Sequence, residues 1–352
     1  MSYKMRMQEK INTIKHKNEV LILAFETSCD ETSIAVIKNG REVLSNVVST
    51  QIEIHARFGG VVPEVASRNH TMAILNVLEE SLSRANVTLL DIDAIAVTYG
   101  AGLIGALMVG VNFAKALAYS NDLPLIAVNH IKGHIAASYL SFKQLEPPFM
   151  CLVVSGGHTA ILKVTDYINH TKIGSTLDDA VGEAYDKVAR ILGLGYPGGP
   201  VVDKLAKEGK ANIQFIARDK LAKTNDFSYS GLKTAVINYV HKLKQNNEPI
   251  IIEDICASFQ VAAIDVLVEK VIRSAKKHKL NRIVLAGGVA ANSYLRERID
   301  LRCKEEGVTA YYPTKAMCTD NAAMIGAQAY YNLINNVGIA DLNLTPVPSI
   351  PL

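Results

Sequence analysis

Short apolar runs joined by polar loops recur along the chain and predict two pairs of strands. In residues 20–40, an apolar run, a loop of small polar residues and a second apolar run end at an Asn-Gly turn. Residues 149–167 show the same order of strand, loop and strand. Because no helical pattern follows either loop, neither is predicted to be a dinucleotide-binding turn or a P-loop.

Two longer segments, residues 93–130 and 281–315, each predict a buried strand, a glycine-containing loop, a helix and a further strand. Alternating strands and helices are typical of a mainly parallel sheet, in which ligands gather at the carboxyl ends of the strands. A pair of histidines follows the first segment, and Asp320 follows the second at nearly the same spacing. The repeat predicts an α/β chain of two similar lobes around one cleft, although such similarity also arises by chance in α/β proteins.

The composition limits the class of protein. With 352 residues, the chain is longer than one core usually supports, so two domains are expected. Apolar residues make up 49% of the chain and charged residues 20%, as in ordinary globular proteins. The net charge of +3 permits a nucleic-acid partner without indicating one.

Cysteine usage and the lack of long apolar runs indicate a cytoplasmic chain. The five cysteines are scattered and show no CxxC spacing, which favours a reducing compartment. No apolar run reaches the ~18 residues that a membrane span needs. The Lys-rich residues 1–19 could form a short amphipathic helix. They lack the apolar stretch of a secretory signal, so we predict a solvated N-terminal extension there.

His130 and His134 are the first candidate for chemistry, because residues four apart share one face of a helix. The protease motif with this spacing has a Glu directly after the first His, where this chain has Ile131. Asp320 is a third candidate ligand, although alone it would be expected only to cap the following helix. Two imidazoles and a carboxylate with open coordination positions suit Zn²⁺ or Fe²⁺. We therefore predict a metal site at these three residues, with structural histidines as the alternative.

Three further segments carry candidate binding residues. The loop at Ser155, Gly156 and Gly157 is expected to need the conformational freedom of glycine and to present backbone N–H groups to a phosphate or carboxylate; the alternative is a plain hairpin turn. A helix predicted to end at Leu192 leads into a Tyr-Pro-Gly-Gly-Pro loop, where Asp186 and Gly199 are the candidates. Asn292 follows a Gly-Gly loop and could bind ribose or a base edge, or only cap its helix.

Two other segments carry charged side chains that could face a metal, a partner or a nucleic acid. The loop at residues 24–33 contains Glu26, Asp30 and Glu31, which would repel a phosphate, so we predict that it faces a metal or a partner. Phe227 and Tyr229 are flanked by basic residues and could stack a base of a nucleic acid; a solvated helix face is equally consistent. These basic residues are Arg218, Lys220, Lys223, Lys233, Lys242 and Lys244.

Taken together, the motifs resemble the TsaD family of tRNA N6-adenosine threonylcarbamoyltransferases, once described as glycoproteases. The resemblance covers roughly residues 20–340 and rests on seven motifs in order: NHIKGH, VVSGGHT, DDAVGEAYDKVAR, YPGGP, FSYSGLKTA, AGGVAANSYLR and MCTDNAAMIG. It implies the duplicated two-domain fold of the actin, Hsp70 and sugar-kinase superfamily (the ASKHA fold), with an interdomain nucleotide cleft. The first lobe would comprise residues 20–145 and 311–345, and the second residues 146–310.

The resemblance also implies an activity, a site and partners. The activity is transfer of threonylcarbamoyl from threonylcarbamoyl-adenylate to N6 of the adenosine 3′ to the anticodon, in tRNAs that read codons beginning with A, with release of AMP. The implied partners are tRNA, a TsaB-like paralogue and a TsaE-like ATPase, in a dimer or a heterocomplex, with the helices after residue 63 and around Glu183 as contact faces. One Fe²⁺ or Zn²⁺ would be held by the catalytic residues His130, His134 and Asp320. The adenylate would contact Val153, Val154, Ser155, Gly156, Gly157, Asp186, Gly199, Asp203 and Asn292.

Three other functions stay open at this point. An ATPase or kinase of the same superfamily would share the fold but would not need the two histidines. A zinc peptidase is disfavoured by Ile131, which replaces the base. A tRNA-binding scaffold would bind a nucleotide without modifying the base.

Overall fold

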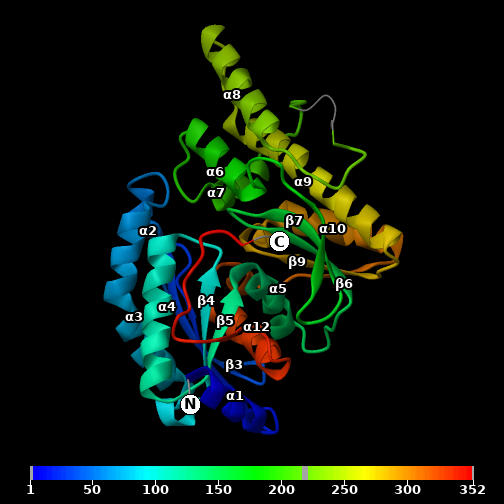
Figure 1. Ribbon diagram of the computed structural model, residues 1–352. Coiled ribbons are helices and arrows are strands. Elements are labelled where there is room, and N and C mark those ends of the chain that lie inside the picture. Colours follow the sequence, from blue (N-terminus) through cyan, green and yellow to red (C-terminus); the bar gives the residue numbers. More distant parts are fainter. Residues whose placement is uncertain (1–2, 216–220, 351–352) are drawn as a thin grey trace. The chain divides into compact units, whose positions relative to one another are not determined.

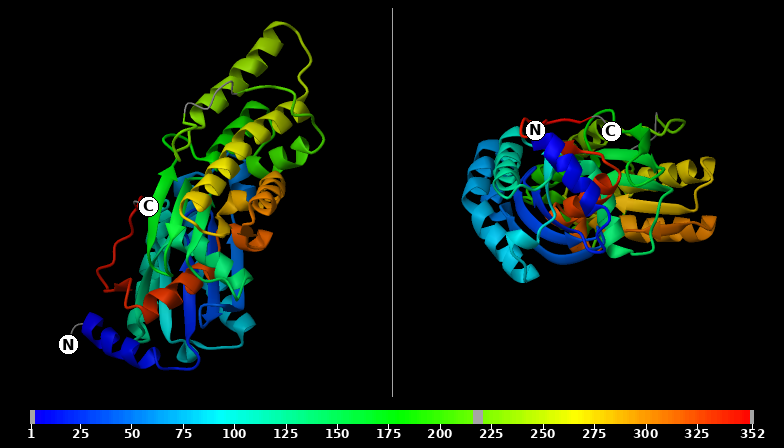
Figure 2. Two further views of the ribbon diagram at one scale, coloured as in Figure 1. Left: turned by 90° about the vertical axis from the view of Figure 1, so that its right-hand side faces the viewer. Right: turned by 60° about the horizontal axis from the view of Figure 1, so that its bottom comes forward.

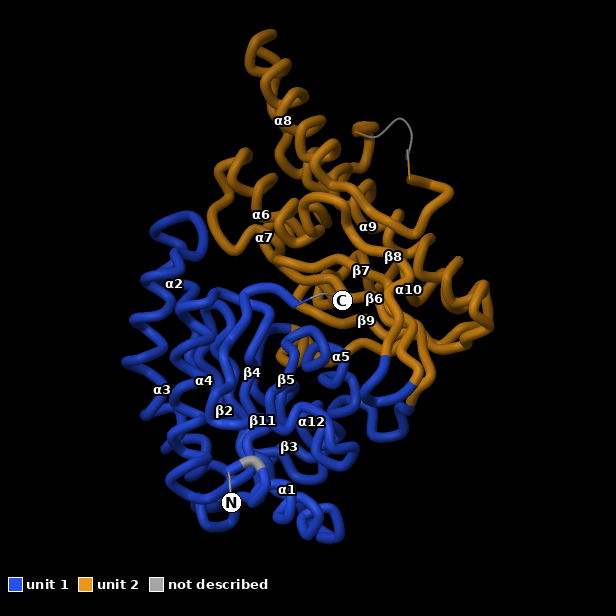
Figure 3. Tube along the Cα trace, viewed as in Figure 1, with its two compact units in different colours: residues 1–146, 166–169, 319–352 blue, residues 147–165, 170–318 orange. Residues whose placement is uncertain are grey.

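Two α/β units make up the chain in the computed structural model, which describes residues 3–215 and 221–350. Unit 1 consists of Met1–Glu146, Asp166–Asn169 and Thr319–Leu352, and unit 2 of Pro147–Thr165 and His170–Cys318 (Figure 3). The boundary differs from the expected one, because residues 311–318 belong to unit 2. There Thr309–Tyr311 pairs with a strand of unit 2 and Cys318 joins the core of that unit.

Unit 1 is built on a six-stranded sheet in the order β11-β5-β4-β1-β2-β3. Figure 1 labels β3, β4 and β5 of this sheet. β1, β4 and β5 run parallel to one another, whereas β1, β2 and β3 form antiparallel hairpins. The central strands are apolar and buried, because helices pack on both faces of such a sheet. The strands are β1 (Leu21–Glu26), β2 (Glu31–Lys38), β3 (Glu42–Thr50), β4 (Ala94–Gly100), β5 (Leu125–Asn129) and β11 (Ile339–Ala340).

Helices α3 and α4 pack against each other and against the strands of unit 1, and α12 packs on β1, β2 and α5. The helices of this unit are α1 (Tyr3–Ile14), α2 (Ile52–Ala56), α3 (Pro63–Ala85), the 3₁₀ helix η1 (Leu89–Asp91), α4 (Ile104–Ser120), α5 (His130–Ser141) and α12 (Ala322–Ile334).

Unit 2 repeats the same strand arrangement in a five-stranded sheet, ordered β10-β9-β6-β7-β8. Its hairpins β6–β7–β8 match β1–β2–β3, and the parallel strands β9 and β10 match β4 and β5. Both predicted hairpins and both strand–helix–strand segments are therefore confirmed. The strands are β6 (Phe149–Val154), β7 (Thr159–Val164), β8 (His170–Ser175), β9 (Arg282–Ala286) and β10 (Thr309–Tyr311).

The core of unit 2 lies between this sheet and its long helices, where β6 residues such as Leu152 pack with α9 residues such as Phe259. The helix predicted to end at Leu192 ends there, with Leu192 as the C-cap of α6. The helices are α6 (Val181–Ile191), α7 (Gly198–Ala206), α8 (Ser230–Gln245), α9 (Ile252–Lys277), the 3₁₀ helix η2 (Gly288–Ala291), α10 (Ser293–Glu306) and α11 (Lys315–Cys318).

The N-terminal segment is a packed helix, so the prediction of a solvated extension is wrong. Tyr3, Met7 and Ile11 of α1 form an apolar stripe at i, i+4 spacing and are buried in unit 1. Tyr3 Oη donates a hydrogen bond to Leu123 O, and α1 contacts β11. Figure 2 shows α1 in dark blue next to the N-terminus. The Lys-rich composition favoured a solvated segment, but Arg6 and Lys10 lie at positions between the buried residues of the stripe.

No helix in the described part of the chain has the length and apolar character needed to cross a bilayer. The five cysteines are free thiols.

Candidate metal centre and nucleotide-binding loops

The two histidines lie in the first turns of α5, immediately after β5. Asn129 starts this helix, because its side-chain oxygen accepts hydrogen bonds from Ile131 N at 2.8 Å and Lys132 N at 3.4 Å. His130 and His134 are buried, and their rings meet edge to face with centroids 4.6 Å apart. The predicted shared helix face is thus confirmed.

Asp320 completes a group of three possible ligands at the start of α12. Its Oδ1 lies 3.1 Å from His134 Nε2 and 3.5 Å from His130 Nε2. The ligand atoms of these three residues all lie within 4.8 Å of one another. Helix α12 is capped by the neighbouring Asn321, whose side chain accepts from Met324 N. Asp320 is therefore not the N-cap, and the capping alternative is wrong.

Gly133 allows the helices that carry these ligands to approach closely. A β-carbon at this position would lie 2.7 Å from Ile325 Cδ1 of α12 and 3.3 Å from Met324 Cγ. Ile325 is completely buried, so its side chain has no open space to move into. A larger residue at 133 would push α5 and α12 apart.

The three residues suit a divalent cation. Neither ring nitrogen of the buried His134 has a hydrogen-bond partner, because the 3.1 Å approach of Nε2 to Asp320 lacks hydrogen-bond geometry. Leaving a buried polar atom unsatisfied costs about 1–3 kcal/mol, and a cation at Nε2 would remove part of that cost. Two imidazoles and one carboxylate form a donor set that Zn²⁺ and Fe²⁺ favour.

The charged groups around the three residues also favour a bound cation. Burial alone would lower the pKa of His130, but the carboxylates of Asp320 and Glu26 outweigh it and raise this pKa to about 9. Burial and the nearby Asp320 and Asp30 raise the pKa of Glu31 to about 10. Glu26 of β1 and Glu31 of β2 thus place two carboxyl groups near Asp320, and a cation there would favour their ionised forms.

The loop from Ser155 to Gly157 lies at the carboxyl end of β6 in unit 2. Ser155 N donates to His158 O at 2.8 Å, and His158 N donates to Ser155 Oγ at 3.1 Å. Neither Gly156 nor Gly157 has a positive φ, so the prediction that this loop needs the conformational freedom of glycine is wrong. A β-carbon at either glycine would meet nothing within 4 Å, so these residues leave open space beside the backbone.

Close backbone contacts bring several predicted residues to this end of the sheet. Gly182, in the first turn of α6, lies against Ser155 O, and Gly287 after β9 lies against Val154 O. Val153 and Val154 are completely buried, main chain included, and pair with β7, so they support the loop that follows and expose no surface of their own. This is the edge at which α/β sheets commonly bind ligands.

The polar candidates of unit 2 connect loops to helices. Asp186 accepts a hydrogen bond from Gly198 N at 2.8 Å, next to Gly199, beside which there is open space. Asp203 accepts from Ser293 N at 3.2 Å and from Ser293 Oγ at 2.8 Å.

Asn292 is the N-cap of α10. Its Oδ1 accepts from Leu295 N at 2.9 Å, and its Nδ2 donates to Gln260 Oε1 at 2.8 Å. The capping role that the sequence left open is therefore confirmed for this residue.

The prediction that Phe227 and Tyr229 stack a base of a nucleic acid is wrong. Phe227 and Tyr229 belong to the core of unit 2, each only 1% exposed, and Tyr229 Oη donates to Ala263 O. Lys233 is paired with Asp179 at 2.8 Å. Of the basic residues predicted to surround them, Arg218 and Lys220 lie outside the described residues.

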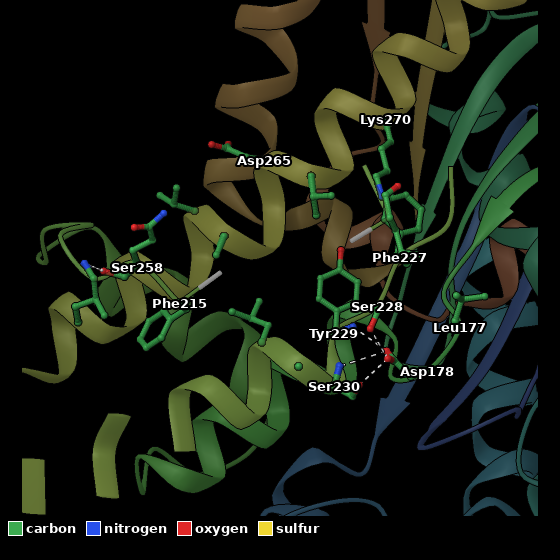
Figure 4. A pocket seen from close by; sticks show the side chains of 18 of the residues that line it. Leu177, Asp178, Phe215, Phe227, Ser228, Tyr229, Ser230, Ser258, Asp265 and Lys270 are labelled. Carbon is green, nitrogen blue, oxygen red and sulfur yellow. Dashed lines mark hydrogen bonds between the residues drawn. The ribbon is translucent and has the colours of Figure 1, made fainter. Parts of the chain in front are cut away.

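The two aromatics line a pocket of about 1150 Å³ in unit 2 (Figure 4). Polar groups at its wall are engaged within the protein: Asp178 accepts from Ser228 and Ser230, and Lys270 donates to Asp226 O. Its lining includes none of the residues predicted to contact the adenylate. The pocket is therefore distinct from the proposed nucleotide loops.

Sequence reasoning missed Thr98 and the role of Glu26. Both are polar residues at the ends of otherwise apolar, buried strands, where a lone polar side chain signals a specific partner. Thr98 Oγ1 donates to Glu26 Oε2 at 2.6 Å.

The chain has the duplicated α/β fold of the ASKHA class. The structure of HypF from T. kodakarensis matches with a TM-score of 0.60 and 14% identity, over 90% of this chain and 48% of that one. The (R)-2-hydroxyglutaryl-CoA dehydratase component A of Acidaminococcus fermentans matches with a TM-score of 0.52 and 14% identity, over 89% of this chain and 99% of that one. At such low identity these matches show the fold alone.

Sequence comparison identifies the family. The family model described as "TsaD: tRNA N6-adenosine threonylcarbamoyltransferase" matches residues 42–327. A tRNA N6-adenosine threonylcarbamoyltransferase of Clostridium perfringens is 55% identical over 94% of this chain and 98% of its own length. One of Clostridioides difficile is 52% identical over 95% and 99%. The chain therefore belongs to the TsaD family, and its activity is the threonylcarbamoylation of tRNA.

Proposed function

We propose that this cytoplasmic enzyme uses one Zn²⁺ or Fe²⁺, held by His130, His134 and Asp320, in transferring threonylcarbamoyl from its adenylate to N6 of the adenosine 3′ to the anticodon. The observation that carries the metal assignment is the convergence of three ligand atoms within 4.8 Å, one of them the unsatisfied Nε2 of a buried histidine. The tRNAs are those that read codons beginning with A, as the family resemblance implies.

The chemistry agrees with the residues present. The donor is a mixed anhydride, so its carbonyl is already activated: the N6 amine forms the new C–N bond, the bond to the phosphate oxygen breaks, and AMP leaves while the amine loses a proton. No protein nucleophile and no water-activating Glu are needed, and Ile131, at the position of that Glu in zinc peptidases, is buried in the core. A bound divalent cation supplies Lewis-acid stabilisation of developing negative charge.

We assign the adenylate to the loops of unit 2. The phosphate would lie at Ser155–Gly157, where the N-terminus of α6 adds its positive dipole end. The open space at Gly199 would accept the sugar or base, with Asp186 and Asp203 holding the surrounding loops in place. Asn292 would contribute by fixing the start of α10. These residues would orient the donor, which can supply a large part of the rate in a reaction between two bound partners.

The proposed protein partners are a TsaB-like paralogue and a TsaE-like ATPase. Helices α3 and α4 of unit 1 expose large apolar side chains: Met72 is 78% exposed, Leu75 53% and Met108 48%. Exposed apolar groups on two adjacent helices are typical of a protein interface. We propose this face for the paralogue.

Nucleoside mass spectrometry tests the function. The chain is incubated with tRNA, threonine, bicarbonate, ATP and the partner proteins, and tRNA nucleosides are measured together with the zinc and iron content of the purified protein. His134→Ala should lose the bound metal and most of the modified adenosine while retaining its far-ultraviolet circular dichroism. His16→Ala, which removes an exposed histidine of the same unit, is the matched control. Normal modification by His134→Ala would refute the metal assignment.

A further inference from the structure

Glu26 is a buried carboxylate at the carboxyl end of β1, the strand that pairs with both β2 and β4 in unit 1. Its side chain is completely inaccessible to solvent. Burying an ionised carboxylate is costly unless it is hydrogen-bonded and paired, so its partners indicate what it does.

Three groups surround this carboxylate. Thr98 Oγ1 from β4 donates to Oε2 at 2.6 Å, and Ser28 N donates to Oε1 at 2.5 Å. His130 Nδ1 lies 3.1 Å from Oε2 and 3.1 Å from Ser28 Oγ. Hydrogen bonds therefore fix both carboxylate oxygens of Glu26, and Oε2 contacts His130 from a defined position.

This contact determines which ring nitrogen of His130 faces the other two proposed metal ligands, His134 and Asp320. A carboxylate only accepts hydrogen bonds and the Ser28 hydroxyl can also accept one, so both contacts fit a ring whose Nδ1 carries the hydrogen. Nε2, on the other side of the ring, lies 3.5 Å from Asp320 Oδ1. Metal-binding histidines commonly donate their second ring N–H to a carboxylate, which fixes the tautomer and the ring orientation.

We infer that Glu26 is a positioning residue that holds His130 through Nδ1, so that Nε2 is presented to a metal ion shared with His134 and Asp320. The inference rests on the proposed metal site. Within the described residues, the group of His, Cys, Asp and Glu atoms close enough to share an ion contains these three ligands and not Glu26. Glu26 therefore acts through His130 and is not itself a ligand.

The other histidine gives an internal contrast. His134 Nδ1 has no hydrogen-bond partner, so packing alone orients that ring. His130 is the ligand that receives a dedicated carboxylate, reached through three strands whose ends lie side by side: β1 supplies Glu26, β4 supplies Thr98, and β5 leads into His130.

Zinc affinity of the full chain tests the inference, measured by competition with a chromophoric chelator. Glu26→Gln keeps the size and an acceptor oxygen but removes the charge, and should weaken Zn²⁺ binding about 10- to 100-fold with one site retained. Thr98→Val leaves the carboxylate in place but removes its hydrogen-bond donor, and should weaken binding to a smaller extent. If Glu26→Gln does not fold, the Zn²⁺ affinity of Thr98→Val tests the positioning role of Glu26.

A control and a spectroscopic measurement separate positioning from general destabilisation. Ser45→Ala removes a buried hydroxyl of the same unit, which contacts Ser81 at 2.8 Å, and should leave the affinity unchanged. The visible absorption of Co²⁺-loaded protein should shift in Glu26→Gln, because the His130 ring is no longer held, and not in Ser45→Ala.

The outcomes distinguish the inference from the proposed function. If His134→Ala abolishes Zn²⁺ binding while Glu26→Gln and Thr98→Val bind with wild-type affinity and an unchanged Co²⁺ spectrum, the role of Glu26 is refuted and the metal site stands. If His134→Ala binds Zn²⁺ like the wild type, the metal site itself is refuted and the inference fails with it.

Discussion

Replacing Gly133 by alanine tests how the three ligands are held together, because this glycine lies between the histidines where α5 meets α12. The new β-carbon would lie 2.7 Å from Ile325 Cδ1, whereas ordinary carbon contacts are about 3.5–4.0 Å. The two atoms must therefore separate by about 1 Å. Ile325 is completely buried, so its terminal methyl can move only against neighbouring side chains, and we expect the helices to take up part of this displacement.

The expected effect on stability is small and the effect on the site is large. Alanine is favoured over glycine inside a helix by about 1 kcal/mol, while overpacking costs about 1–3 kcal/mol. We expect Gly133→Ala to destabilise the protein by at most about 2 kcal/mol. A binding site tolerates displacements of only about 0.5 Å, so Zn²⁺ affinity should fall at least about tenfold.

A second substitution provides the decisive comparison. Ile325→Val removes Cδ1, the atom that the new methyl group would meet, at a cost of about 0.5–1.5 kcal/mol. The double variant Gly133→Ala/Ile325→Val should regain most of the Zn²⁺ affinity, although it is less stable than the wild type. Affinity is measured by chelator competition and stability by urea unfolding. Unchanged Zn²⁺ affinity in Gly133→Ala, or no recovery in the double variant, would show that helix spacing does not set the ligand geometry.

Three further predictions follow from individual contacts. The His130 pKa of about 9 means that a proton occupies the ring below that pH and competes with metal, so Zn²⁺ affinity should rise from pH 6 to pH 9; a flat profile in pH-stepped titrations would contradict the assignment. Asn292→Ala removes the cap of α10 and should lower the free energy of unfolding by about 1–2 kcal/mol; weaker AMP binding in calorimetry without this loss would instead favour direct contact with the nucleotide. Met7→Ala opens a cavity under α1 and should cost about 2–5 kcal/mol in urea unfolding, whereas an effect near zero would favour the solvated extension expected from the sequence.

Much of the fold could be predicted from local patterns. The apolar runs at 20–40 and 149–167 have the length and flanking turns of strands. Five strands follow the same order in both units, which confirms the predicted repeat, and β11 adds a sixth strand to unit 1. The spacing of His130 and His134 predicted a shared helix face, because residues four apart in sequence lie side by side on the surface of a helix.

Predictions failed where a side chain's surroundings come from distant parts of the chain. Phe227 and Tyr229 lie among lysines in the sequence but inside the core of unit 2 in space. The N-terminal helix was expected to be solvated because lysines dominate its composition, but Met7 and Ile11 are completely buried. Charge and aromatic content of a segment do not reveal which face packs against the rest of the protein.

By itself, the sequence determined the strands and helices, their repeated order and the chemical types of the ligands, because each depends on residues close together along the chain. Only the tertiary structure decided that Asn321 caps α12 while Asp320 faces the histidines, and that Glu26 holds one of them. Residues 26, 98, 130 and 320 are far apart in sequence and meet only where β1, β4, β5 and α12 pack together. Such meetings depend on the packing of whole elements, which local periodicity does not encode.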